Sequence, residues 1–243
     1  MTDRKRLARL RGRGRWHEAL SLAGDDGLLR ADILNEEALF AGSADARAAA
    51  AVELDRVEAR LEAERGRILH AQFLAERVED PRELAHFEAS LDAARRAGDP
   101  VLEAWARFWI GIVHQVVRDD HRTALPHFEA AHAAGQRHDE PVLASYAIRH
   151  IAFAWQADGR HDDAWRAFEE SVALRRAERF WPGVAAGLLT LAEVAHDRGD
   201  TRTARRLLVR ARRTAERCGA TRFLERADDL AQRMAVDSRA SGG

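Results

Sequence analysis

Apolar residues recur along the chain at intervals of three and four, and no stretch shows sustained alternation of apolar and polar residues. The first pattern is the period of an amphipathic helix, and the second would indicate a half-buried strand. Alanine, leucine, glutamate and arginine, which all favour helices, dominate the chain, and only five residues are proline. We therefore expect an all-α protein without a β-sheet.

The pattern repeats about every forty residues. HFEAS begins at residue 86 and HFEAA at residue 127. The match continues through one apolar position per repeat, spaced by 41, 40 and 40 residues: Phe87, Phe128, Phe168 and Leu208. Small residues follow each of these positions, and a polar or glycine-containing segment ends each copy. A fixed spacing of this kind indicates stacked repeat units.

Prolines and acidic turns mark the expected helix starts. Four of the five prolines stand where a helix would begin: Pro81, Pro100, Pro141 and Pro182. A proline at the first helical position loses no hydrogen bond, and Asp80 and Asp99 can cap the free amides there. The segments VRDDHRTA, ADGRHDDA and DRGDTRTA form further breaks, each with an Asp able to cap the next helix. Pro126 is the exception, and it predicts a kinked or delayed helix.

These breaks predict pairs of antiparallel helices at about 101–136, 141–177 and 182–217, a degenerate pair at about 60–97 and a closing helix at about 221–235. Residues 1–59 are expected to form N-terminal helices, as a degenerate repeat or cap of the same continuous domain, because no linker separates them from residues 60–235. Residues 43–77 form a long helical pattern interrupted only by Gly66. Residues 236–243 are expected to be a flexible tail.

Small and aromatic residues take fixed places in these pairs. Second helices carry Ala124, Phe128 and Ala131, then Ala164, Phe168 and Ser171, then Ala204, Leu208 and Ala211. First helices carry Ala71, Ala152 and Ala192, whereas Ile112 departs from the pattern. Over residues 60–235 the chain thus resembles the tetratricopeptide repeat family, although its repeat is longer than the usual length of about 34 residues. The resemblance implies a right-handed superhelix, a TPR-like α-solenoid with about three full repeats and a C-terminal capping helix, as in many bacterial regulators.

Such arrays bind ligands on a concave wall made mainly of first helices. The core-facing positions of these helices are Phe108, Ile112, Ile148, Ala152, Leu188 and Ala192. A neighbouring stripe at steps of three and four provides the predicted groove residues: Trp109, Val113, Tyr146, Arg149, His150, Phe153, Gln156, Glu193 and His196. This mixture suits a peptide, a partner protein or a small amphipathic ligand, with Arg149 facing an anionic group. A one-residue error in register would instead make these positions core.

Two classes of function fit this surface. We favour a non-enzymatic binding or scaffold module of bacterial regulation, without catalytic residues or cofactors. The alternative is an enzyme or auxiliary protein of a biosynthetic pathway that holds a small hydrophobic substrate, in which Arg149, His150, Glu193 and His196 would supply acid, base and anion contact. A closed cavity with His150 or His196 beside a carboxylate would favour the enzyme, although a histidine among apolar neighbours is more often structural.

Charge and cysteine content narrow the partners. Lys+Arg is 39 and Asp+Glu is 40, so the net charge of -1 gives no overall attraction to nucleic acid or anionic membranes, and we expect neither. Two local basic segments could still bind phosphates or an acidic protein surface. They are residues 4–15 (RKRLARLRGRGR) and a stripe on one helix face formed by Arg202, Arg206, Arg210, Arg213 and Arg217. The single Cys218 and the lack of an apolar leader favour a cytoplasmic protein. A homodimer can accompany either function.

Metal and nucleotide sites are not expected. The histidines His121, His127, His132 and His138 are spaced by six, five and six residues, whereas ligand pairs on a helix are three or four residues apart. No phosphate-binding GxxxxGK[ST] segment is present.

Overall fold

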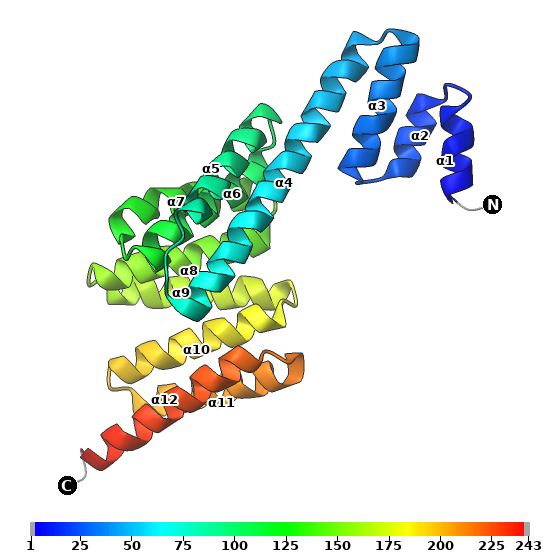
Figure 1. Cartoon of the computed structure of the whole chain (residues 1–243). Coiled ribbons are helices and arrows are strands. Elements are labelled where there is room, and N and C mark those ends of the chain that lie inside the picture. The colour runs from blue at the N-terminus through cyan, green and yellow to red at the C-terminus, as the bar shows by residue number, and fades with distance from the viewer. Residues whose placement is uncertain (1–2, 241–243) are drawn as a thin grey trace. The chain divides into compact units, whose positions relative to one another are not determined.

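The computed structural model describes residues 3–240, and that range is helical throughout, with turns but no strand (Figure 1). The predicted all-α fold is therefore confirmed. The chain divides into two compact units, residues 1–118 and 119–243. Each unit is described by itself below.

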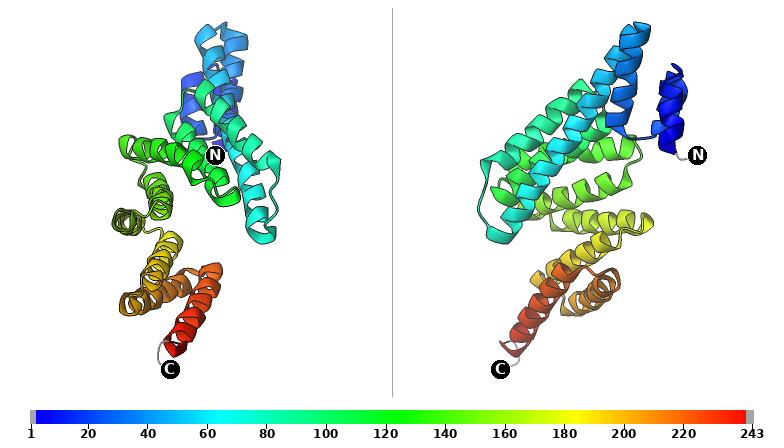
Figure 2. Two further views of the ribbon diagram at one scale, coloured as in Figure 1. Left: turned by 90° about the vertical axis from the view of Figure 1, so that its left-hand side faces the viewer. Right: turned by 45° about the vertical axis from the view of Figure 1, so that its right-hand side comes forward.

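The first unit contains α1 (Asp3–Arg11), α2 (Trp16–Ala23), α3 (Gly27–Ala41), α4 (Ala44–Glu76), α5 (Pro81–Arg96), α6 (Pro100–Ile112) and the short π-helix η1 (Val113–Val117). Helix α4 is 33 residues long and organises the unit. Figure 2 shows α3 beside the N-terminal part of α4 and α5 beside its C-terminal part. An ion pair from Arg30 to Glu53 (2.8 Å) ties α3 to α4, and the hydroxyl of Ser90 on α5 donates to the carbonyl of Ala59 (2.8 Å).

Gly66 does not interrupt this helix, contrary to the sequence interpretation. Helix α4 continues through it, and Gly66 is buried. An added Cβ would lie only 2.6 Å from Cε1 of Phe87, so the glycine makes room for that ring. The expected start of the degenerate pair at about residue 60 falls inside α4, which joins the N-terminal helices to the first repeat without a loop.

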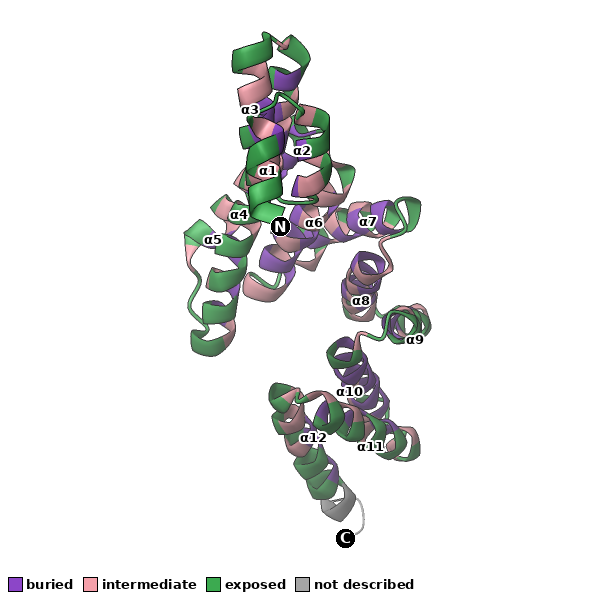
Figure 3. Cartoon of the chain, turned by 90° about the vertical axis from the view of Figure 1, so that its right-hand side faces the viewer, coloured by how far each residue is buried: buried purple, intermediate pink, exposed green. Residues whose placement is uncertain are grey.

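The second unit contains α7 (His121–Arg137), α8 (Pro141–Ala157), α9 (His161–Ala177), α10 (Trp181–Asp197), α11 (Thr201–Cys218) and α12 (Thr221–Ala240). The observed bounds match the pairs predicted at 141–177 and 182–217 and the start of the closing helix to within a few residues, but α6 and α7, predicted as a pair, fall in different units. Figure 3 shows α8, α10 and α12 on one side of this unit and α9 and α11 on the other. Helix α12 runs to Ala240, so residues 236–240 of the expected tail are helical, and residues 241–243 lie outside the described range.

The predicted core positions are confirmed. All six core-facing residues of the first helices are at most 5% exposed: Phe108, Ile112, Ile148, Ala152, Leu188 and Ala192. Phe87, Phe128 and Phe168 are buried at the repeat position of the second helices. In α11 the fourth copy differs, because Leu207 is buried and Leu208 is only partly so.

Most of the predicted helix starts are also confirmed. Asp80, Asp99, Asp120 and Asp200 each accept a hydrogen bond from a first-turn amide of the following helix. The prediction fails for α9, where the residue before the helix is Arg160, no side chain caps the helix, and two aspartates lie in the first turn instead. Pro126 does not delay α7, which begins five residues earlier.

Candidate binding surface

One partly exposed face of the second unit carries most of the predicted groove residues. On α8, Tyr146, Arg149, Phe153 and Gln156 lie three or four residues apart and are all half-buried, whereas the core residues between them are buried. On α10, Glu193 is half-buried although its neighbours are buried, and His196 is also half-buried. We call these six residues the α8–α10 surface. Their accessibility follows from the same helical period that buries Ile148, Ala152, Leu188 and Ala192.

Arg149 is the central charged group of this surface. One terminal nitrogen, Nη2, donates to the hydroxyl of Thr190 on α10 (3.0 Å), and the guanidinium carbon lies 4.7 Å from the ring centre of Phe153. Its Nε is buried and has no hydrogen-bond partner in the described part of the chain. Within residues 3–240, no carboxylate lies at ion-pair distance from Arg149. This guanidinium therefore keeps unused hydrogen-bonding capacity.

The electrostatic surroundings of Arg149 are positive. Burial lowers the pKa of Arg149 to about 9, and repulsion by Arg175 and Arg226 acts in the same direction, while Glu193 and Tyr146 oppose it. At neutral pH the group remains charged. A negatively charged ligand group at the exposed part of Arg149 would relieve the repulsion, and charge-assisted hydrogen bonds to such a group are the stronger ones.

Arg175 of α9 supports the surface from inside. It is 2% exposed, its Nη1 donates to the carbonyl of Gly183 (3.0 Å) and its Nε to the hydroxyl of Ser145 (3.2 Å). Its guanidinium lies 4.6 Å from the ring centre of Tyr146. Burial lowers the pKa of Arg175 to about 10. Tyr146 is therefore held over a fixed cation.

Helix α12 adds charged contacts that the sequence did not reveal. Nη2 of Arg226 binds both carboxylate oxygens of Glu193 (2.9 and 2.8 Å). Nε2 of His196 lies 3.1 Å from a carboxylate oxygen of Asp237. Because Arg226 already occupies Glu193, this acid does not neutralise Arg149 through a hydrogen bond.

His150 lies beneath this face. It is 7% exposed, stacks on Phe128 at a centroid distance of 5.0 Å, and also contacts Phe153 at 5.8 Å. It would support Phe153 instead of contacting a ligand. Gln156 has a buried Oε1 with no hydrogen-bond partner among the described residues, so it retains an acceptor.

Trp109 and Val113, the other predicted groove residues, belong to the first unit. Trp109 stacks on Phe87 (5.4 Å between ring centres, 11° between planes), and the guanidinium carbon of Arg67 lies 5.5 Å from its ring centre. Val113 is 1% exposed and belongs to the core cluster of Phe87. Trp109 is half-buried, whereas Val113 presents no surface to a ligand.

Two further properties of the described residues bear on function. No group of three or more His, Cys, Asp or Glu side chains gathers as metal ligands would within residues 3–240. In the same range, no helix combines the length and apolar character needed to cross a bilayer.

Comparison with known proteins supports the fold alone. No family model matches the chain, and no curated protein matches it by sequence. Among solved structures, aspartyl phosphate phosphatase F from Bacillus subtilis is similar with a TM-score of 0.54 and 13% identity, over 87% of this chain and 63% of that one. BtubC (BKLC) from P. vanneervenii is similar with a TM-score of 0.50 and 15% identity, over 88% of this chain and 78% of that one. The chain thus spans less than two thirds of the Bacillus protein.

Proposed function

We propose that the chain is a TPR-like binding or scaffold module that holds a peptide or a segment of a partner protein on the α8–α10 surface. The observation that carries this proposal is Arg149, a partly exposed cation with no ion-paired acid among the described residues and with the aromatic side chains Tyr146 and Phe153 on the same helix face. A ligand carboxylate would bind Arg149, and apolar ligand groups would pack on Tyr146 and Phe153. Aromatic and arginine anchors of this kind dominate the energetics of many interfaces.

The regulatory role in this proposal rests on the resemblance to helical-repeat regulators, because the similarity to the Bacillus phosphatase supports the fold alone. Trp109 lies in the first unit and is not part of this proposed site. Binding to a small amphipathic ligand with a carboxylate would use the same contacts.

An enzymatic role is the second candidate, and one observation favours it. His196 and Asp237 form a histidine–carboxylate pair at 3.1 Å. The His196 side chain is 13% exposed, but the Asp237 side chain is 64% exposed, so the carboxylate is solvated and does not form an enclosed site in which a general base would be shielded. The contacts around Arg149 therefore support binding better than catalysis.

The test uses synthetic hexapeptide libraries with a free C-terminal carboxylate, and the same libraries amidated, selected on the purified full chain. Free-carboxylate peptides should be enriched, and Arg149→Met should weaken the best of them by about 2 kcal/mol, roughly 30-fold. Arg149→Met should still fold because it leaves no buried acid without its partner. Arg202→Met, at an exposed arginine of α11, is the matched control. Equal enrichment of amidated peptides, or equal binding by Arg149→Met, would refute the assignment.

A further inference from the structure

Two arginines from different helices are held on one turn of α10. Nη2 of Arg149 on α8 donates to the hydroxyl of Thr190 (3.0 Å), and Nη2 of Arg226 on α12 binds the carboxylate of Glu193 (2.8 and 2.9 Å). Thr190 and Glu193 are three residues apart, so they lie on the same side of α10 and about 4.5 Å apart along its axis. The guanidinium groups of Arg149 and Arg226 therefore converge on the same part of the α8–α10 surface.

Both guanidinium groups keep unused donors. Within residues 3–240, Nη1 of Arg149 and both Nε and Nη1 of Arg226 have no hydrogen-bond partner, and none of these three atoms is buried. The Arg226 side chain is 39% exposed, and Arg149 is half-buried. A ligand group placed between them can accept hydrogen bonds from two planar guanidiniums at once.

The charge around these donors is positive and is not balanced. In the described part of the chain, the buried Arg175 donates to a hydroxyl and to carbonyl oxygens and pairs with no carboxylate. Three guanidiniums, those of Arg149, Arg175 and Arg226, thus share the single carboxylate of Glu193, which leaves a net charge of +2. Arg175 and Arg226 both repel Arg149. A bound anion would relieve this repulsion.

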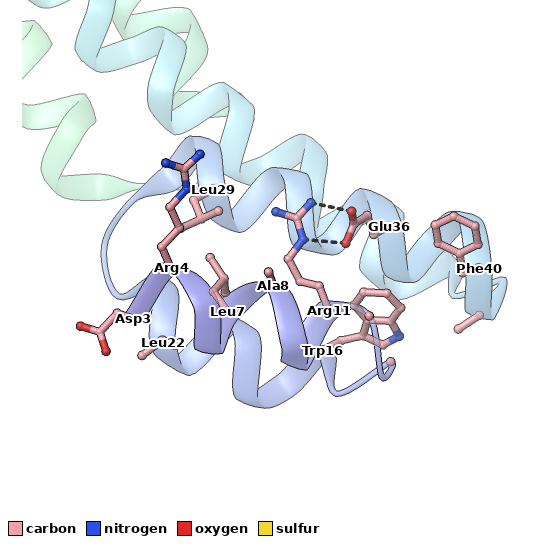
Figure 4. Close-up of a pocket in the computed structure, with 13 residues that line it drawn as sticks. Asp3, Arg4, Leu7, Ala8, Arg11, Trp16, Leu22, Leu29, Glu36 and Phe40 are labelled. Carbon is pink, nitrogen blue, oxygen red and sulfur yellow. Dashed lines mark hydrogen bonds and ion pairs between the residues drawn. The ribbon is translucent and has the colours of Figure 1, made fainter. Parts of the chain in front are cut away.

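Asp237 does not balance this charge, because its side chain is 64% exposed and pairs with His196 (3.1 Å). The groove between α1 and α3 of the first unit shows the opposite arrangement. Figure 4 shows Arg11 of α1 paired there with Glu36 of α3. An anion in that groove would have to break this pair to reach Arg11, whereas at Arg149 it meets a guanidinium without an acid.

A net charge of +2 favours a doubly charged ligand group. A carboxylate carries one negative charge and would leave half of the excess unbalanced. A phosphomonoester carries about −1.5 to −2 at pH 7 and has three strong acceptor oxygens. The phosphodiesters of a nucleic acid carry one charge each and are spread along a strand, so they suit a row of cations better than a single site. Clusters of arginine commonly recognise phosphorylated peptide segments.

We propose that the ligand segment on the α8–α10 surface is phosphorylated, and that its phosphomonoester binds between Arg149 and Arg226. Apolar residues next to the phosphorylated one would pack on Tyr146 and Phe153. Glu193 would hold Arg226 in place through Nη2, which leaves Nε and Nη1 for the phosphate. This inference rests on the proposed function, because it uses the same surface, and it adds the chemical class of the anionic group.

The test uses three libraries of acetylated and amidated hexapeptides that differ in one fixed residue, which is phosphoserine, aspartate or serine at the third position. Each library is selected on the purified full chain. The best phosphoserine sequence is then made with all three residues at that position, and binding is measured by fluorescence anisotropy. The phosphoserine peptide should bind about ten-fold more tightly than the aspartate peptide, and the serine peptide should bind most weakly.

Two variants separate a phosphate site from a carboxylate site. Arg226→Met/Glu193→Gln removes the second guanidinium without leaving Glu193 unpaired, so it should weaken the phosphoserine peptide about ten-fold and the aspartate peptide less than about three-fold. Glu193→Gln alone keeps Arg226 and removes the opposing charge, so it should strengthen binding of the phosphoserine peptide about three-fold, a gain that a misfolded chain cannot show. The matched control, Arg222→Met/Glu225→Gln, makes the same two substitutions at exposed positions of α12 and should change neither affinity.

The inference is overturned if the phosphoserine and aspartate peptides bind alike, or if the double variant weakens both equally. The proposed function still stands in that case, provided that the aspartate peptide loses affinity in Arg149→Met. If neither peptide depends on Arg149, the proposed function fails together with the inference. Free phosphoserine that competes as strongly as the phosphoserine peptide binds would also overturn the inference, since the ligand would then be a small phosphorylated molecule.

Discussion

Replacing Gly66 by alanine tests the packing of α4 on α5 against simple helix propensity. In an exposed helix interior this change stabilises by about 1 kcal/mol. Here the new Cβ would lie 2.6, 2.7 and 2.8 Å from three ring carbons of Phe87. Ordinary contacts between carbon atoms are about 3.5–4.0 Å, so the overlap is about 1 Å.

The ring has little room to retreat. Phe87 is fully buried, and it stacks on Trp109 at 5.4 Å with nearly parallel planes. Overpacking a core costs about 1–3 kcal/mol. After the gain in propensity is subtracted, we expect Gly66→Ala to lower the free energy of unfolding of the first unit by up to about 2 kcal/mol.

Hydrogen exchange followed by mass spectrometry, on peptides from α4 and α5, reports this unit separately from residues 119–243 and so avoids assuming a single unfolding transition for the whole chain. The double variant Gly66→Ala/Phe87→Leu should lose less stability than the two single variants together, by about 1 kcal/mol or more, because the smaller leucine makes room for the new methyl group. If Gly66→Ala sped up exchange only in peptides of the second unit, the predicted clash with Phe87 in the first unit would be wrong. Slower exchange in α4 for Gly66→Ala would refute the reasoning, because it would show that propensity alone governs the site.

Three further predictions follow from individual contacts. Arg175→Met should lower the stability of the second unit by about 2 kcal/mol, because the buried hydrogen bonds from its guanidinium to Ser145 and Gly183 are lost, and exchange of the α9 and α10 amides should report it. Ser43→Ala should cost about 1 kcal/mol by removing the cap of α4, measured by exchange of its first-turn amides. Hydrogen bonds from the side chain and amide of Arg82 lower the pKa of Asp80 to about 2. The ionised Asp80 cap should therefore contribute its full stabilisation above the usual pKa of 3.8 and lose it as the pH falls through about 2. A carbon-13 titration of the Asp80 carboxyl with a midpoint near 3.8 would contradict the contact with Arg82.

The helix pairs could be predicted because several independent sequence signals mark the same helix boundaries in each repeat. The aspartate caps, the first-position prolines and the buried phenylalanines fix the same boundaries independently, so an error in one signal is corrected by another. The single α4 was harder to predict, because a glycine in a helical pattern is ambiguous without its neighbour. Only the position of Phe87 explains Gly66. The π-helix of Val113–Val117 had no local signal of its own.

The sequence predicted which residues share the face of the candidate surface, but not the hydrogen bonds and ion pairs that they make. The helical period placed Arg149 and Glu193 on the accessible face, and they are there. The period could not show that Arg226, more than thirty residues further along the chain, would bind Glu193. It also gave no sign that Arg175 of α9 would be buried, with hydrogen-bond partners from two other segments. Such contacts depend on tertiary distances that a local pattern does not contain.

The continuity of α4 restricts how this chain can change in length. Arg30 of α3 pairs with Glu53, and Arg96 of α5 pairs with Asp55 and Glu58, so partners of two different helices lie within about one and a half turns of α4. Inserting one residue there would rotate the rest of α4 by about 100° relative to its N-terminal part. Either the contacts with α3 or those with α5 would then be lost. An insertion of seven residues would restore the phase to within about 20°. Length variation among natural or engineered versions should therefore occur in the turns, while α4 keeps its phase.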